Sequence, residues 1–154
     1  MILSFLAENS EIILRLTAAI FCGTLIGGER LLVHKEAGIK THSLVAMGAA
    51  VFILISEMMI EKYSGLSGLN PTMIPGQIIV GIGFLGAGLI MHQGSHLSGL
   101  TTASGLWVTA GIGMAAGFGM YNFAFIITAL VLMIFVMMNI LENPIRKISN
   151  NLDR

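Results

Sequence analysis

The chain has 154 residues, of which 55% are hydrophobic and only 10% are charged, and its formal net charge is zero. A water-soluble domain of this length could hardly carry so few charges, so most of the solvent around the fold is lipid. The zero net charge and the lack of a dense Lys and Arg run argue against a nucleic-acid partner. The composition therefore predicts a single all-α membrane domain over residues 1–154.

Five apolar segments are long enough to cross a bilayer as helices. Residues 63–141 contain no charged side chain, which leaves room for three passes of about 20 residues each. We expect a polytopic transmembrane bundle with helices at about 12–32, 43–60, 76–91, 100–119 and 121–141, and a short tail over 142–154. The first segment is predicted to be a helix and not a cleaved signal, because Glu8 and Glu11 precede it and no Lys or Arg does.

The distribution of basic residues predicts an orientation, because Lys and Arg concentrate on the cytoplasmic side of membrane proteins. The link after the first segment and the tail carry most of them, whereas the opposite end has mainly Lys62. We therefore expect the N-terminus outside and the C-terminus in the cytoplasm. Tyr63 and Tyr121 then lie at the outer interface, where amphipathic rings are favoured.

The run GIGFLGAG at 81–88 has the glycine spacing of a dinucleotide-binding loop, but no acidic residue follows about 20 positions later to hold a ribose. Small residues also allow close helix packing in lipid, within one chain or between two copies, and we expect Leu at Gly81 or Gly113 to disrupt it. Trp107 is expected to be a packing anchor. The predicted small packing positions are Gly23, Gly27, Gly81, Gly83, Gly86, Gly88, Gly105, Thr109, Gly113 and Gly117.

Arg15, Glu29 and Arg30 are charged residues within the first expected helix, where each costs roughly 2.5 to 3.5 kcal/mol at mid-bilayer. Arg15 and Glu29 share a face but lie about 21 Å apart at 1.5 Å per residue, so they cannot pair. Arg15 is expected to extend to the outer headgroups. Glu29 is either structural or functional, and Arg30 is expected to point elsewhere, so that adjacency alone does not neutralise Glu29.

The link at 33–42 includes Lys40, Thr41 and His42, which suit either a topology-setting loop or a headgroup or partner site. Thr41 or Ser43 is expected to cap the second helix. Thr101 and Thr102 are likewise expected to cap the start of the fourth helix.

His92 and His96 have the spacing of a helical metal pair, but Gly94 and Ser95 between them favour a loop. No Cys or carboxylate completes a site there. We therefore predict no metal site, no cofactor and no catalytic residues.

Three blocks, GGERLLVHKEAGIKTHSLVAMGAAVF, GQIIVGIGFLGAGLI and GLTTASGLWVTAGIGMAAG, resemble the signature blocks of the MgtC/SapB family of membrane proteins. The resemblance covers the first four helices and corresponds to the transmembrane domain of the family without its C-terminal soluble domain. It implies motif positions at Glu29, Arg30, Ala37, Gly38, Lys40, Thr41, His42, Gln77, Gly81 to Gly88, Thr101, Thr102 and Trp107. Lys40 stands where the family usually has Arg, which weakens a bidentate role there. Asn70 and Met73 stand where charged residues are frequent.

The resemblance implies a bacterial inner-membrane protein linked to magnesium homeostasis or stress adaptation. The leading hypothesis is a non-enzymatic regulator, a homo-oligomer and most simply a dimer, that contacts other membrane proteins such as an ATPase. The alternative is a transporter or channel for a cation or small solute, with Glu29 and Gln77 on a polar path. Bare Mg²⁺ would want carboxylate oxygens, which the last three helices lack.

Overall fold

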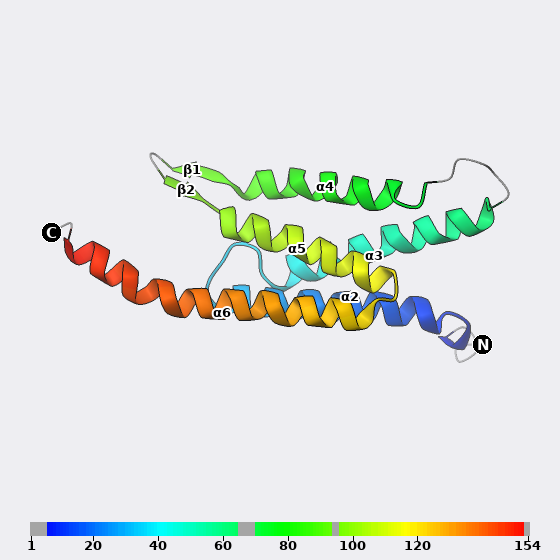
Figure 1. Ribbon diagram of the computed structural model, residues 1–154, viewed down its shortest axis with the longest axis horizontal. Helices are drawn as coiled ribbons and strands as arrows, with labels where there is room; N and C mark the ends of the chain where they lie inside the picture. Colours follow the sequence, from blue (N-terminus) through cyan, green and yellow to red (C-terminus); the bar gives the residue numbers. More distant parts are fainter. Residues whose placement is uncertain (1–5, 65–69, 94–95, 153–154) are drawn as a thin grey trace.

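The computed structural model describes residues 6–64, 70–93 and 96–152, and the side chains of 92–96 and 142–152 lie outside that description. Five long helices lie side by side along one axis, and a small hairpin closes one end (Figure 1). The elements are α2 (Ser10–Leu32), α3 (Ile39–Lys62), α4 (Met73–Leu89), β1 (Met91–Gln93), β2 (His96–Ser98), α5 (Leu100–Gly117) and α6 (Tyr121–Leu152).

The predominantly helical fold is confirmed, but most helix boundaries differ by a few residues from the sequence prediction, and the start of α3 and the end of α6 differ most. α3 begins at Ile39, so Lys40, Thr41 and His42 lie in its first turn and not in a loop. Its N-cap is Gly38, which offers no side-chain hydrogen bond, and the predicted caps at Thr41 and Ser43 are therefore wrong. The predicted tail continues as helix, because α6 runs to Leu152.

A β-hairpin, and not a loop, joins α4 to α5. β1 and β2 pair antiparallel with Gln93 opposite His96, so the chain at these histidines is extended and they cannot share a helical face. Their side chains lie outside the described residues. α5 starts after Gly99, whose φ of 88° is left-handed, and its N-cap makes no side-chain bond. The predicted caps at Thr101 and Thr102 are wrong.

α2, α3 and α5 pack against one another, and glycines of α2 and α5 let these helices touch the backbone of α3. A Cβ at Gly23 would lie 2.6 Å from the His42 carbonyl oxygen, and one at Gly27 would lie 2.6 Å from the Ile39 Cα. One turn further along α3, a Cβ at Gly113 of α5 would lie 2.2 Å from the Ala46 carbonyl oxygen. Side chains larger than hydrogen cannot fit at these positions, so the predicted close packing is confirmed for them.

The same close contact continues at the end of α5, where a Cβ at Gly117 would lie 2.9 Å from the Ala50 Cα. We call α2, α3 and α5 the tight core, because glycines set their spacing. α6 covers this core with Ala124, Val131 and Phe135.

α4 is held differently from the tight core. It packs mainly on α5, through Ile82 and through Gly86, whose Cβ would lie 3.6 Å from that of Ala103. A Cβ at Gly81, Gly83 or Gly88 would have no described atom within 4 Å, so these glycines make no close helix contact within the described part of the chain, and contact with a second copy stays a prediction. The same open space contradicts the expected damage from Leu at Gly81.

Trp107, on α5, is 53% exposed and is therefore not the packing anchor that its position predicted. Its ring borders a shallow cavity of about 220 Å³ between α4, α5 and α6. Side chains therefore fill the space between α4, α5 and α6 less completely than the interior of the tight core.

Among the described residues, three helices are long and apolar enough to span a membrane: Ser10–Leu32, Ile39–Lys62 and the apolar part of α6, Tyr121–Leu141. α4 has 17 residues and is shorter than these three. α5 is rich in Gly and Thr, and Thr102, Gly105, Thr109 and Gly113 are buried against other helices. The chain is thus a membrane protein, in which α5 meets protein on the faces where the other helices would meet lipid.

Candidate functional site

The candidate site is a set of buried and partly buried polar side chains inside the bundle, near the loop that joins α2 to α3. Its members, which we call the polar cluster, come from four helices: Glu29 and Arg30 of α2, His42 of α3, Thr109 of α5 and Asn139 of α6. Arg30 is 2% exposed, and His42 and Thr109 are completely buried. Polar groups at such depth are retained only when partners compensate for the lost hydration.

Glu29 binds a partner with each carboxylate oxygen. Oε2 lies 3.3 Å from the Nη1 atom of Arg30, and Oε1 accepts a hydrogen bond of 3.0 Å from the Nδ2 atom of Asn139. The prediction that adjacency would not neutralise Glu29 is therefore wrong, because the long Arg30 side chain can turn back to its neighbour. The Arg30 guanidinium also stacks 4.3 Å from the centre of the Phe135 ring.

His42 occupies the centre of the bundle and is fixed by Thr109. Its Nδ1 atom lies 2.8 Å from the Thr109 hydroxyl oxygen, and that oxygen also lies 2.8 Å from the Gly105 carbonyl, to which the hydroxyl can donate. The other ring nitrogen, Nε2, is buried beside the backbone of Ala37 without a well-formed hydrogen bond in the described residues. The imidazole therefore links α3 to α5 through a hydrogen bond at Nδ1 only.

Gly105 leaves the space that the Phe135 ring and the His42 imidazole occupy. A Cβ at this position would lie 3.0 Å from the Phe135 ring and 3.6 Å from the Cε1 atom of His42. Phe135 carries Arg30 on its face, so a larger residue at 105 would push on both Arg30 and His42. The site has the character of a rigid, internally bonded polar interior and not of an open catalytic cleft.

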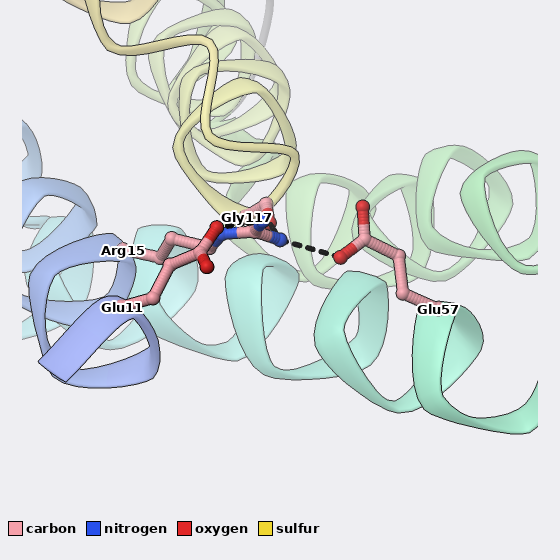
Figure 2. Close-up of polar contacts among 4 residues, drawn as sticks. All are labelled: Glu11, Arg15, Glu57 and Gly117. Carbon is pink, nitrogen blue, oxygen red and sulfur yellow. Dashed lines mark hydrogen bonds and ion pairs between the residues drawn. The ribbon is translucent and has the colours of Figure 1, made fainter. Parts of the chain in front are cut away.

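A second group of charges lies at the opposite end of the bundle. Figure 2 shows the Arg15 side chain between Glu11 of its own helix and Glu57 of α3, with the Gly117 carbonyl alongside. Arg15 forms ion pairs with both carboxylates and donates a hydrogen bond of 2.9 Å to that carbonyl oxygen. The expected extension of Arg15 to the headgroups is wrong, because its side chain is only 15% exposed and joins α2, α3 and α5.

The remaining predicted residues are not part of the polar cluster. Lys40, Thr41 and Gln77 line a separate groove of about 780 Å³ between α3 and α4. Thr102 is buried and makes a long hydrogen bond of 3.5 Å to Glu36, whereas Thr101 is exposed. The structure thus divides the predicted set into a buried interior and a groove.

Two polar partners were missed in the sequence. Glu57 is the charged residue in the second apolar segment and could have been found by the same reasoning that selected Arg15. Asn139, near the end of the last apolar segment, carries no charge, so nothing in the local pattern distinguishes it from a surface amide. Only the fold brings it to Glu29, across 110 positions of sequence.

Comparison with known proteins places this chain in a family. The MgtC family profile matches residues 16–144. The chain is 44% identical to "Putative magnesium transporter YhiD" of Escherichia coli K12 over 133 residues, which cover 82% of this chain and 61% of that protein.

It is also 49% identical to "Protein MgtC" of Salmonella typhimurium LT2 over 92 residues, covering 60% of this chain and 37% of the relative. The match thus spans less than two thirds of the length of these relatives. No solved structure matches significantly. With the family profile covering most of its length and containing every member of the polar cluster, the chain belongs to the MgtC family.

Proposed function

We propose that this chain is a non-enzymatic regulator in a bacterial inner membrane that acts in magnesium or cation homeostasis and stress adaptation through contacts with other membrane proteins, such as an ATPase. The magnesium connection comes from the name of the YhiD relative. The choice of a regulator over a transporter rests on how the chain uses its own buried charges.

The observation that carries this proposal is the double engagement of Glu29. Both carboxylate oxygens bind groups of the same chain, the Arg30 guanidinium and the Asn139 amide. Mg²⁺ prefers several carboxylate or carbonyl oxygens and keeps much of its water. To bind it, Glu29 would have to give up both partners in an interior next to a fixed positive charge. The polar cluster is therefore better suited to fixing helix positions than to passing cations.

The transporter alternative has one observation in its favour. A carboxylate inside a membrane-spanning helix is a default candidate for an ion or proton path, and Glu29 is only 10% exposed. Release of Glu29 by Arg30 and Asn139 in another conformation would open such a path.

A reconstituted flux assay separates the two functions. Proteoliposomes with the purified chain are loaded with a Mg²⁺-sensitive dye, and Glu29→Gln is compared with Glu11→Gln, a matched loss of an exposed carboxylate. The regulator predicts no flux above empty vesicles in any sample, together with co-purification of a membrane ATPase from native membranes. Flux that Glu29→Gln abolishes and Glu11→Gln preserves would establish the transporter instead.

We also propose a five-pass topology with the N-terminus outside and the C-terminus in the cytoplasm. In Figure 1, α4 and α5 run alongside the three long apolar helices, and a 17- or 18-residue helix is about 26 Å long, close to the hydrocarbon thickness. The test labels single cysteines at Lys35 and Ser64 with a membrane-impermeant maleimide on intact cells. Labelling of Ser64→Cys alone supports the orientation, and labelling of Lys35→Cys alone reverses it.

The proposed oligomer is a dimer through the side of α4 that carries Gly83. Val80 and Phe84 are 69% and 81% exposed there, and a Cβ at Gly83 would meet no atom of the described residues within 4 Å. Small residues allow two helices to approach closely in lipid. A Gly83→Cys variant that forms a disulfide dimer in membranes supports this interface, whereas a chain that stays monomeric under oxidation removes it.

A further inference from the structure

The groove between α3 and α4 is mostly apolar, with Lys40 and Thr41 where α3 begins and the amide of Gln77 on the first half of α4. Its walls are formed by Leu44, Gly48 and Phe52 of α3 and by Ile78 and Leu85 of α4, and Ala110 of α5 lies at its floor. The groove has a volume of about 780 Å³, within the size range of pockets for small organic ligands. The two helices diverge here because α4 packs mainly on α5.

Glycines keep this groove open on both walls. A Cβ at Gly48 on α3 or at Gly81 on α4 would meet no atom within 4 Å. In the tight core, a neighbouring backbone fills the space beside each glycine. Beside Gly48 and Gly81, no atom of the described residues fills that space. A flexible apolar chain can therefore lie between the two helices without moving either.

The charge lies at the end of the groove where α3 begins. Among the described residues that line the groove, Lys40 alone is charged, and Thr41 adds a hydroxyl beside it. Lys40 forms no ion pair with any side chain that the structure describes. The first turn of α3 also has no acidic residue, and its dipole adds to the positive potential there. This end of the groove is complementary to an anion.

The length of the groove matches one leaflet of a bilayer. From Lys40 to Phe52, α3 rises about 18 Å at 1.5 Å per residue. Half of the hydrocarbon core is about 15 Å thick. A molecule with a negative head at Lys40 and a tail towards Phe52 would lie as a lipid does in its own leaflet.

We propose that the groove between α3 and α4 is a binding site for a phospholipid with a net negative headgroup, whose phosphate contacts Lys40 and Thr41 and whose acyl chain lies between Gly48 and Gly81. The site depends on α3 crossing the membrane, and it holds whether the chain regulates a partner or transports a solute.

Native mass spectrometry of the full chain in detergent tests the site, with phosphatidylglycerol and phosphatidylcholine of identical acyl chains as probes. We expect phosphatidylglycerol to be retained about tenfold more than phosphatidylcholine. Lys40→Gln should remove that preference, because it deletes the charge and leaves the apolar groove. Gly81→Leu, which fills the groove, should reduce binding of both lipids, and Gly48→Leu on the opposite wall should repeat its effect.

Two variants serve as matched controls. Gly83→Leu places the same side chain on α4 outside the groove, and Lys62→Gln removes a charge from the other end of α3. Both should retain the lipid preference of the unchanged chain.

Equal retention of the two lipids, or retention that Gly81→Leu and Gly48→Leu leave unchanged, would overturn the proposal. So would a disulfide dimer formed through Gly81→Cys in membranes, because a second copy would then occupy the groove.

Discussion

The tight core and α4 are built from the same small residues, but they use them in opposite ways. In α5, Gly113 and Gly117 touch the backbone of α3, and in α2, Gly23 and Gly27 touch the start of the same helix. In α4, a Cβ at three of the glycines in the run at 81–88 would meet no atom of the described residues within 4 Å. The comparison teaches that glycine spacing marks a surface available for close approach, and that the neighbours of each helix decide whether the chain itself fills it.

The largest effect should come from Arg30, which lies on α2 of the tight core and contacts both Glu29 and Phe135. Arg30→Met leaves the Glu29 carboxylate buried without its cation, a change that typically costs about 3–5 kcal/mol. We expect a large fall in the melting temperature in detergent, measured by fluorescence-detected size exclusion. Lys35→Met, on the exposed loop, is the control and should be neutral. An equal effect of the two changes would show that Arg30 is not part of a buried pair.

A smaller effect is expected at the glycine contact between α5 and α3. Gly113→Ala places a Cβ 2.2 Å from the Ala46 carbonyl oxygen, and overpacking of this kind costs about 1–3 kcal/mol. Gly111 lies on the same helix with no atom within 4 Å of its Cβ position, so Gly111→Ala is a matched control. The same melting assay should show a loss for the first variant and none for the second. If both variants melt alike, glycines do not set the spacing of α3 and α5.

Loss of the hydrogen bond between His42 of α3 and Thr109 of α5 should lower the free energy of unfolding by less. Thr109→Val keeps the shape of the side chain and removes the hydroxyl that binds His42, at about 1–2 kcal/mol. Thr101→Val, on the exposed side of α5, should change little. Hydrogen exchange at the start of α3 would detect the loosening, and unchanged protection there would mean that Thr109 does not hold His42.

The smallest effect, and one of opposite sign, is predicted for α4. Gly83→Ala meets open space and improves helix propensity, so the chain should be stabilised by up to about 1 kcal/mol. The measurement is the melting temperature at low protein concentration, where dimers dissociate. A loss of stability as large as that of Gly113→Ala would erase the distinction between the two regions.

Much of the fold follows from the sequence because it depends on local pattern. The order of the five long helices and the buried stripe of α5, which includes Gly105, Thr109 and Gly113, came from hydropathy and spacing. The start of α3 at Ile39 did not, because the polar residues at 40–42 resemble a loop until their neighbours are known. His42 is buried only because Gly105 and Thr109 make room and a hydrogen bond for it.

The candidate site was predicted only in part, for a related reason. Glu29 and Arg30 were recognisable as costly charges, but their partners come from distant segments. Asn139 meets Glu29, and Glu57 meets Arg15 across 42 positions, so these pairings exist only after the helices assemble. The position of Gly81 in a groove depends likewise on α4 packing mainly on α5 and leaving the side towards α3 open.

The extension of α6 has a mechanical consequence. The helix is continuous from the apolar stretch that ends near Leu141 to Leu152, so about 16 Å of it projects beyond that stretch, as the far end of α6 in Figure 1 shows. Asn139 lies on the same continuous helix, two residues before Leu141, and donates a hydrogen bond to Glu29. A force on the projecting part of α6 would therefore act on a helix that is hydrogen-bonded to a charged group of the polar cluster.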